Sequence, residues 1–393
     1  MRQAVIASAC RTAIGDFGGG LKTVPAKKLG AIVITEAIRR AGLAADQVDE
    51  VIMGCVLPHN MGQNPARQAV LTAGLPMGVE CLTINKVCGS GLKAVMLAAQ
   101  AIACGDAEVV VAGGMENMNQ APFMLPKARY GYRMGAAALI DGLLQDGLWD
   151  VNNDIHMGAT AEHIADRFGI GREEMDRFAL SSYDKALAAQ RDGKLDAEIV
   201  PVEVPQRKGE PLLFERDEVP RQTSLELLGK LRPAFKKDAG RVTAGNSSKI
   251  SDGAAALVIT SRERAETLGL EIMATVGAQG AAAQDPMEVL VTPILSIPKV
   301  LDKAGLGVAD IDLHEVNEAF SVSTVAVMRE LGIPEERLNV HGGAIALGHP
   351  IGASGARVLT TLLYALADRG LKRGMASLCL GGGEAVSLIV ERP

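Results

Sequence analysis

The feature that most constrains the fold of this chain is a weak internal repeat. In the first half, a glycine-bearing turn at residues 85–91 (NKVCGSG) leads into a helical stretch, and a strand-like run at 109–116 (VVVAGGME) follows. In the second half, residues 348–355 (GHPIGASG) lead into a helical stretch, and 377–384 (SLCLGGGE) follow. Two similar halves that face each other would bring these four loops together, so one site would be built from residues distant in sequence.

Short β-branched runs alternate with helical patterns, which is typical of an α/β fold. We predict strands at residues 3–7, 50–56, 108–112, 255–260, 375–380 and 385–390. We predict helices at residues 28–41, 89–103 and 173–190, with Gly42 and Gly105 ending the first two.

The middle of the chain interrupts this alternation. From residue 120 to about 248, Met, Gly, Pro and charged residues dominate, and we interpret the segment as a large insertion carried by the α/β frame. Residues 205–241 hold nine Lys and Arg against six Asp and Glu, although the whole chain has a net charge of −6. A solvated surface is the ordinary interpretation of such a segment. A site for a phosphate-bearing ligand is the alternative.

Charge and length exclude several classes of protein. A chain of 393 residues is long enough for two ordinary domains. It has no broad basic field, so we expect no nucleic-acid partner. We expect no signal peptide and no membrane span, because no apolar run reaches the required length. None of the six cysteines forms a CxxC pair, which argues for a reducing cytoplasm and against a zinc or disulfide framework.

Cys88 is the first candidate for chemistry, because it precedes a glycine-initiated helix. The partial positive charge of a helix N-terminus favours a thiolate, and backbone N–H groups at such a turn can hold an oxyanion. A phosphate-binding loop and a buried cysteine are the alternatives, and the spacing does not match the GxGxxG dinucleotide fingerprint.

Three further residues lie at the other glycine-bearing loops. His349 lies on a turn before a helix, where its imidazole could move a proton, although a structural histidine is the alternative. Cys379 ends a strand and could act as an acid or base if its pKa were lowered, although a core cysteine is the alternative. Asn317 could orient a water or an oxyanion, or cap a helix.

These residues lie in motifs that resemble those of the thiolases, most closely the acetyl-CoA acetyltransferase type. The motifs appear in the family's order over essentially the whole chain: NKVCGSGLKA, HEVNEAF, GGAIALGHPIGASGAR and CLGGGE, with GQNPARQA, HMGATAEHIA and RVTAGNSSKISDGAAA in support. Each motif is moderately specific, and their joint order is highly specific.

The resemblance implies an architecture. Two similar α/β halves, each with a five-stranded sheet, would stack as five layers, with a loop domain inserted in the first half. On this chain the first half would comprise residues 1–119 and 249–270, the insertion 120–248 and the second half 271–393. The family also implies a cytoplasmic homotetramer acting on acyl-CoA in fatty acid metabolism, with no metal or cofactor.

The resemblance also implies residue roles. Cys88 matches the nucleophile that becomes acylated, His349 the residue that activates it, and Cys379 the acid/base for the α-proton of a second acetyl-CoA. Asn317 matches the residue that holds a water beside His349 in one oxyanion hole, and the N–H groups of Cys88 and Gly381 match the other hole. The coenzyme A path would include His156, Met157, Arg221, Phe235, Ala244 and Ser248.

Several departures from the family pattern leave other functions open. Glu384 and Ala385 follow the oxyanion loop where many relatives have an uncharged residue and glycine, and Ser247 replaces a usual alanine. Residues 286–298 lack the Met-Gly-x-Gly-Pro pattern of short-chain members, so a longer-chain 3-ketoacyl-CoA thiolase is the main alternative. A non-catalytic acyl-CoA-binding protein would not need Cys88 and His349, and a decarboxylating ketosynthase would need a second histidine at position 317.

Overall fold

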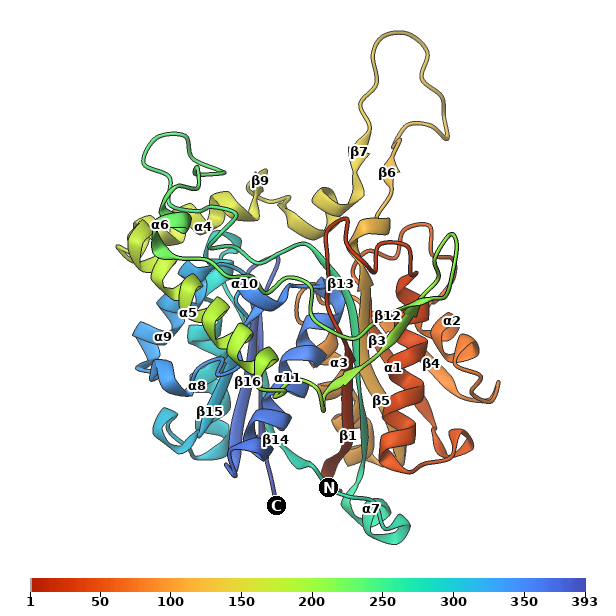
Figure 1. Cartoon of the computed structure of the whole chain (residues 1–393). Helices are drawn as coiled ribbons and strands as arrows, with labels where there is room; N and C mark the ends of the chain where they lie inside the picture. The colour runs from red at the N-terminus through yellow and green to blue at the C-terminus, as the bar shows by residue number, and fades with distance from the viewer. Residues whose placement is uncertain (1) are drawn as a thin grey trace.

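In the computed structural model, which describes residues 2–393, strand pairing connects the two halves in one 11-stranded sheet (Figure 1). Nine of its strands lie on one path, and the short strands β2 (Gly15–Asp16) and β10 (Ile199–Val200) pair with β13 and β1. The order is β15-β16-β17-β14-β1-β13-β5-β3-β4. The first half contributes β1 (Ala4–Thr12), β3 (Glu50–Gly54), β4 (Glu80–Ile84), β5 (Val109–Asn117) and β13 (Ser251–Ser261). The second half contributes β14 (Ala274–Ala283), β15 (Leu313–Val316), β16 (Arg373–Leu380) and β17 (Glu384–Glu391).

The strand pairing shows that the two halves repeat one another. In the first half β13 is antiparallel to β5, and β5, β3 and β4 are parallel. In the second half β17 is antiparallel to β16, β16 is parallel to β15, and a parallel bridge between His314 and Leu338 takes the place of the fifth strand. The halves join where β1 pairs with β14 over two residues of each strand. The repeat read from the glycine-bearing loops is therefore confirmed.

Helices complete five layers (Figure 1). On the outer face of the first half lie α1 (Ala26–Ala41) and α2 (Pro65–Thr72), and the second half carries α8 (Pro293–Ala304) and α9 (Ser321–Leu331). Between the halves, α3 (Ser90–Cys104) packs against α11 (Ile351–Asp368). The predicted α/β fold of two stacked halves is thus confirmed.

Glycines allow the two inner helices to cross closely. A Cβ atom at Gly91 of α3 would lie 2.6 Å from the backbone nitrogen of Ala356 on α11. Gly355 of α11 faces the backbone of Leu92 in the same way. The stretch Val87–Cys104, which includes α3, is long and apolar enough to span a membrane by composition, but α3 lies in the middle layer of the fold.

The insertion consists of short elements above the two halves. Its helices are α4 (Met157–Arg167), α5 (Arg172–Arg191) and α6 (Leu225–Gly229). Its strands are short: β6 (Phe123–Met124), β7 (Ile140–Asp141), β8 (Trp149–Asp150), β9 (Ile155–His156), β10 (Ile199–Val200), β11 (Val202–Val204) and β12 (Leu212–Phe214). Beyond β6 and β7 the chain projects away from the body as a long loop (Figure 1).

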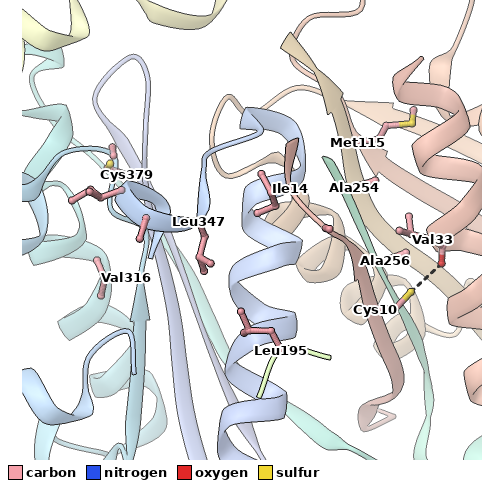
Figure 2. Close-up of a cluster of buried hydrophobic side chains, with 14 of the residues drawn as sticks. Cys10, Ile14, Val33, Met115, Leu195, Ala254, Ala256, Val316, Leu347 and Cys379 are labelled. Atoms are coloured by element: carbon pink, nitrogen blue, oxygen red, sulfur yellow. Dashed lines mark hydrogen bonds between the residues drawn. The ribbon is translucent and has the colours of Figure 1, made fainter. Parts of the chain in front are cut away.

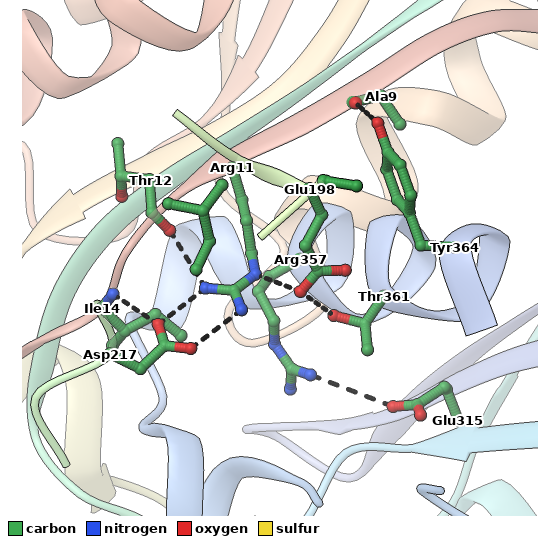
Figure 3. Close-up of polar contacts among 12 residues, drawn as sticks. Ala9, Arg11, Thr12, Ile14, Glu198, Asp217, Glu315, Arg357, Thr361 and Tyr364 are labelled. Carbon is green, nitrogen blue, oxygen red and sulfur yellow. Dashed lines mark hydrogen bonds and ion pairs between the residues drawn. The ribbon is translucent and has the colours of Figure 1, made fainter. Parts of the chain in front are cut away.

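A buried ionic network anchors the insertion to the frame (Figure 3). Arg11 of β1 is fully buried and donates to Glu198 at 2.5 Å and to Asp217 at 2.7 and 2.9 Å. Removing one partner of a buried pair leaves an uncompensated charge, which costs about 3–5 kcal/mol. The insertion therefore has a fixed attachment to the frame beneath its surface loops.

Small aliphatic side chains fill the core, as expected for a chain with 3% aromatic residues. Figure 2 shows the cluster reaching both halves, with Cys10 and Val33 on one side and Val316 and Cys379 on the other. The thiol of Cys10 donates to the carbonyl of Val33 at 3.3 Å, and burial raises the pKa of Cys10 to about 12. Cys10 is thus a core residue.

The predicted elements are present, with shifted ends. All six predicted strands and all three predicted helices are found, but β13 starts at Ser251 and β5 runs to Asn117. Gly42 and Gly105 end their helices at φ 72° and 85°, as predicted. The strands β4, β14 and β15 were not predicted.

Candidate active site

A cavity of about 290 Å³ lies where the two halves meet the insertion. Its walls are mostly apolar, with few polar groups aimed inward. It brings together nine of the eleven predicted site residues: Cys88, His156, Met157, Phe235, Ala244, Ser248, His349, Cys379 and Gly381. Three of the four loops that the repeat was predicted to bring together line the cavity, namely 85–91, 348–355 and 377–384, whereas loop 109–116 does not. The insertion supplies other lining residues, as the resemblance implied.

Cys88 lies in a tight turn just before α3. Ser90 holds this turn, because its Oγ accepts from the backbone N–H of Lys86 at 2.8 Å and donates to the carbonyl of Val87 at 2.7 Å. Val87 has φ +45°, a strained conformation for a β-branched residue. A Cβ at Gly89 would come within 2.9 Å of Val386 in the other half, so the close approach requires glycine. The turn therefore presents the sulfur in one fixed position.

The electrostatics of Cys88 differ from the sequence prediction. Burial against apolar walls raises the pKa of Cys88 to about 11, although the backbone N–H groups of Gly381 and of Cys88 itself oppose the rise. The expected thiolate at a helix N-terminus was wrong, because desolvation exceeds the effect of the N–H groups. The resting group is a thiol and needs a base.

His349 is built to be that base. Its Nδ1 lies 2.6 Å from Ser354 Oγ, and Ser354 donates its own proton to the carbonyl of Pro350 at 2.9 Å. Nδ1 must then carry the imidazole proton, which leaves a lone pair on Nε2. Burial lowers the pKa of His349 to about 3, and Nε2 has no hydrogen-bond partner among residues 2–393. The imidazole is neutral and its free nitrogen is available.

Cys379 is the penultimate residue of β16 and is buried. Burial raises the pKa of its thiol, and the neighbouring Cys88 adds to the rise. The role inferred from the sequence was conditional on a lowered pKa, and this condition is not met. When a thiol has a raised pKa, the thiolate that forms on deprotonation is a strong base.

Asn317 and Arg221 do not line the cavity. Asn317 follows β15 and donates its backbone N–H to Ser377 at 2.9 Å. Both polar atoms of its buried amide lack partners among the described residues, which is a typical place for an ordered water. The N-cap of α9 is Phe320, so Asn317 is not a helix cap. Arg221 is exposed and lies over the ring of Tyr183, 5.7 Å from its centre.

The wall formed by the insertion is partly aromatic. The rings of His156 and Phe235 stack with centres 4.6 Å apart. His156 also accepts from the backbone N–H of Gly158 at 2.9 Å, so the start of α4 fixes its ring. A stacked pair beside Met157 gives a flat apolar surface for an extended ligand arm.

Two residues in this region were missed by sequence reasoning. Lys249 lines the cavity, its ammonium bonds to the carbonyls of Ala244 and Ser247, and burial lowers its pKa to about 8. The sequence feature that could have identified Lys249 is that it is the single lysine within GNSSKISDG. Buried Glu116 accepts from the backbone N–H groups of Val56 and Gly352, and so joins loops of the two halves. The sequence feature that could have identified Glu116 is its position at the end of VVVAGGME.

The geometry supports one kind of chemistry. A thiol and a neutral imidazole with a free nitrogen line the same cavity, and the backbone N–H groups of Cys88 and Gly381 lower the pKa of the thiol. Such a set can take up an acyl group covalently and stabilise the oxyanion that forms. The second thiol and the long apolar cavity leave room for a second reactant.

Comparisons with known proteins agree with this chemistry. The family models "Thiolase, N-terminal domain" and "Thiolase, C-terminal domain" match residues 4–263 and 270–392. Acetyl-CoA acetyltransferases of Pseudomonas aeruginosa and Cupriavidus necator are each 54% identical over 393 residues, covering 100% of both chains. The crystal structure of the Bacillus anthracis acetyl-CoA acetyltransferase superposes with a TM-score of 0.98 at 42% identity, covering 100% of this chain and 99% of that one.

Proposed function

Because the chain belongs to the thiolase family, we propose that it is an acetyl-CoA acetyltransferase, which condenses two acetyl-CoA to acetoacetyl-CoA and coenzyme A and catalyses the reverse cleavage. The names of the full-length relatives support this acyltransferase activity over the longer-chain and non-catalytic alternatives. The observation that carries it is the meeting of Cys88, His349, Cys379 and Gly381 on one cavity.

The first half-reaction acylates Cys88. Nε2 of His349 takes the thiol proton as the sulfur attacks the thioester carbonyl, so no free thiolate is needed beforehand. The backbone N–H groups of Cys88 and Gly381 stabilise the oxyanion. The departing coenzyme A thiolate takes the proton of Cys379. The products are acetyl-Cys88, protonated His349 and the thiolate of Cys379.

The second half-reaction forms the carbon–carbon bond. The Cys379 thiolate removes an α-proton from the second acetyl-CoA, and its raised pKa makes it a strong base for this step. His349 and a water held by Asn317 stabilise the enolate oxygen. The enolate carbon attacks the acetyl group, and the Cys88 sulfur leaves with the proton of His349. All three groups return to their starting protonation states, and no metal or cofactor takes part.

The insertion is proposed to bind coenzyme A. Residues 120–248 would form this loop domain, with 1–119 and 249–270 as the first half and 271–393 as the second. The pantetheine arm would lie along His156, Met157, Phe235, Ala244 and Ser248, all of which line the cavity. Arg221, outside the cavity, would meet the nucleotide end.

We also propose a cytoplasmic homotetramer that serves fatty acid metabolism. The loop between β6 and β7 supports an assembly, because it projects from the body and exposes Tyr130 by 91% and Met134 by 100%. Leu125, Tyr132 and Leu139 are exposed on the same loop, and apolar side chains gathered on one surface can mark an interface. Light scattering on the purified protein tests the tetramer.

The test of the activity is coenzyme A-dependent cleavage of acetoacetyl-CoA by the purified protein, with a chelator present and no nicotinamide added. Rapid cleavage is expected. A folded protein that leaves acetoacetyl-CoA intact but cleaves longer 3-ketoacyl-CoA would refute the short-chain assignment. No cleavage of either, with tight acyl-CoA binding, would favour a binding protein.

A further inference from the structure

An ion pair connects the two catalytic loops across the halves of the fold. Nζ of Lys86 lies 2.6 Å from Oε2 of Glu384, and the two residues are 298 positions apart in sequence. The side chains are 23% and 39% exposed, so the pair is partly shielded from water. Glu384 is one of the departures from the family pattern noted in the sequence.

Each partner is close in sequence to a group of the proposed site. Lys86 precedes Cys88 by two residues in the turn that Ser90 holds. Glu384 opens β17 opposite Leu380, and Gly381 begins the short loop between them. Gly381 also contacts this turn, because a Cβ atom at Gly381 would lie 3.1 Å from the side chain of Val87, and Gly381 and Cys88 line the same cavity. The ion pair and this contact therefore join the same two segments of chain.

The loop that carries Gly381 has few other anchors. Gly382 and Gly383 have φ +88° and +90° and no side chains to pack. The carbonyl of Gly383 accepts from the backbone N–H of Gln284 at 2.8 Å, which fixes the far end of the loop within the second half. That bond does not fix the loop relative to Cys88, which belongs to the first half.

We infer that Lys86 and Glu384 are positioning residues that hold the Gly381 N–H against the Cys88 sulfur. Neither side chain lines the cavity, so the pair acts through loop geometry rather than by touching the substrate. This inference rests on the proposed acyl transfer through Cys88 and names a further requirement of that step.

The experiment compares two reactions of the same sulfur. Acetylation by acetyl-CoA in a single turnover, followed by mass spectrometry of Cys88, needs the oxyanion donor. Alkylation of Cys88 by iodoacetamide forms no oxyanion, so the Gly381 N–H affects it only through the pKa of the thiol. The variants are Glu384→Gln, Lys86→Met and the double variant. The control is Asp368→Asn, which breaks the 2.6 Å ion pair of Lys194 and Asp368 at another place in the fold.

We expect each single variant to acetylate about two- to fivefold more slowly, in the range of a partly exposed ion pair. Alkylation should slow less than acetylation, because it loses only the lowering of the thiol pKa by the Gly381 N–H. The acetyl-CoA concentration for half-maximal rate should stay unchanged, and the double variant should be no slower than the singles. The control should match the unmodified protein.

Other results would overturn the inference. Unchanged acetylation in both single variants would mean that the ion pair is a surface contact without a role in positioning Gly381. Equal losses in acetylation and alkylation would mean that the pair acts on Cys88 itself, and multiplied losses in the double variant would mean that the residues act separately. Absence of acetyl-Cys88 in the unmodified protein would instead overturn the proposed function, and this inference with it.

Discussion

Removing the hydroxyl of Ser354 should disable His349 without changing the shape of the cavity. Ser354 Oγ lies 2.6 Å from His349 Nδ1 and is fully buried, and Ser354 does not line the cavity. In Ser354→Ala the Nδ1–H would lose its partner in a buried place, which costs about 1–3 kcal/mol. The imidazole can avoid part of that cost by moving its proton to Nε2.

The catalytic consequence follows from that tautomer change. A protonated Nε2 cannot take the proton of Cys88, so only the fraction of molecules in the original tautomer would react. A shift of about 1–3 kcal/mol lowers that fraction, and kcat with it, by about 5- to 150-fold. KM for acetyl-CoA should change little, because the substrate does not touch Ser354.

Steady-state condensation and cleavage assays on Ser354→Ala would test this. Thr360→Val is the matched control, because Thr360 is buried on the same helix and its hydroxyl has no partner among the described residues. The control should keep its activity. A kcat of Ser354→Ala within twofold of the unmodified protein would refute the tautomer argument, and a raised KM with unchanged kcat would mean that Ser354 acts on binding.

Three further outcomes are expected. Cys379→Ser should still form acetyl-Cys88, detected by mass spectrometry, but should condense at least ~100-fold more slowly; full turnover would remove Cys379 from proton transfer. Arg221→Ala should raise the KM for coenzyme A by about 5- to 10-fold more than it lowers kcat in the cleavage assay, and an unchanged KM would place coenzyme A elsewhere. Burial lowers the pKa of His314 and of His341 from 6.5 to about 4, so the folded state favours their neutral forms. That stability is present above pH 6.5 and should fall by about 1.4 kcal/mol per pH unit and per histidine as the pH drops towards 4. Urea unfolding at several pH values measures this, and a His314→Asn variant with an undiminished slope would contradict it.

The fold could be predicted from sequence wherever the apolar pattern was clear. Alternating strands and helices indicated α/β, and the repeated glycine-bearing loops indicated two halves. The strand β14 was missed because its sequence, ATVGAQGAAA, is dominated by alanine and glycine, which have low strand propensity. Its position is set by pairing with β1 and β17, and such tertiary pairing is not visible in a local window.

The sequence predicted which residues line the site but not the pKa shifts of its groups. Motif order identified Cys88, His349 and Cys379, and the cavity contains all three. The thiolate expected at Cys88 was wrong, and the lowered pKa on which the role of Cys379 was conditional is absent. The sequence shows a helix start and glycines but not the apolar walls around the sulfur atoms. Lys249 was missed for a similar reason, since its ammonium faces carbonyls of its own loop.

The repeat explains why the nucleophile and its base can meet at all. Cys88 stands two residues before the first residue of α3, and His349 stands two residues before the first residue of α11. The two groups thus occupy equivalent positions in the two halves, each ahead of an inner helix. They come together because these helices cross at Gly91 and Gly355, where a Cβ would push the backbones apart. A neutral thiol and a neutral imidazole can share this apolar cavity without the cost of a buried ion pair, and charge develops only when the sulfur attacks the thioester carbonyl.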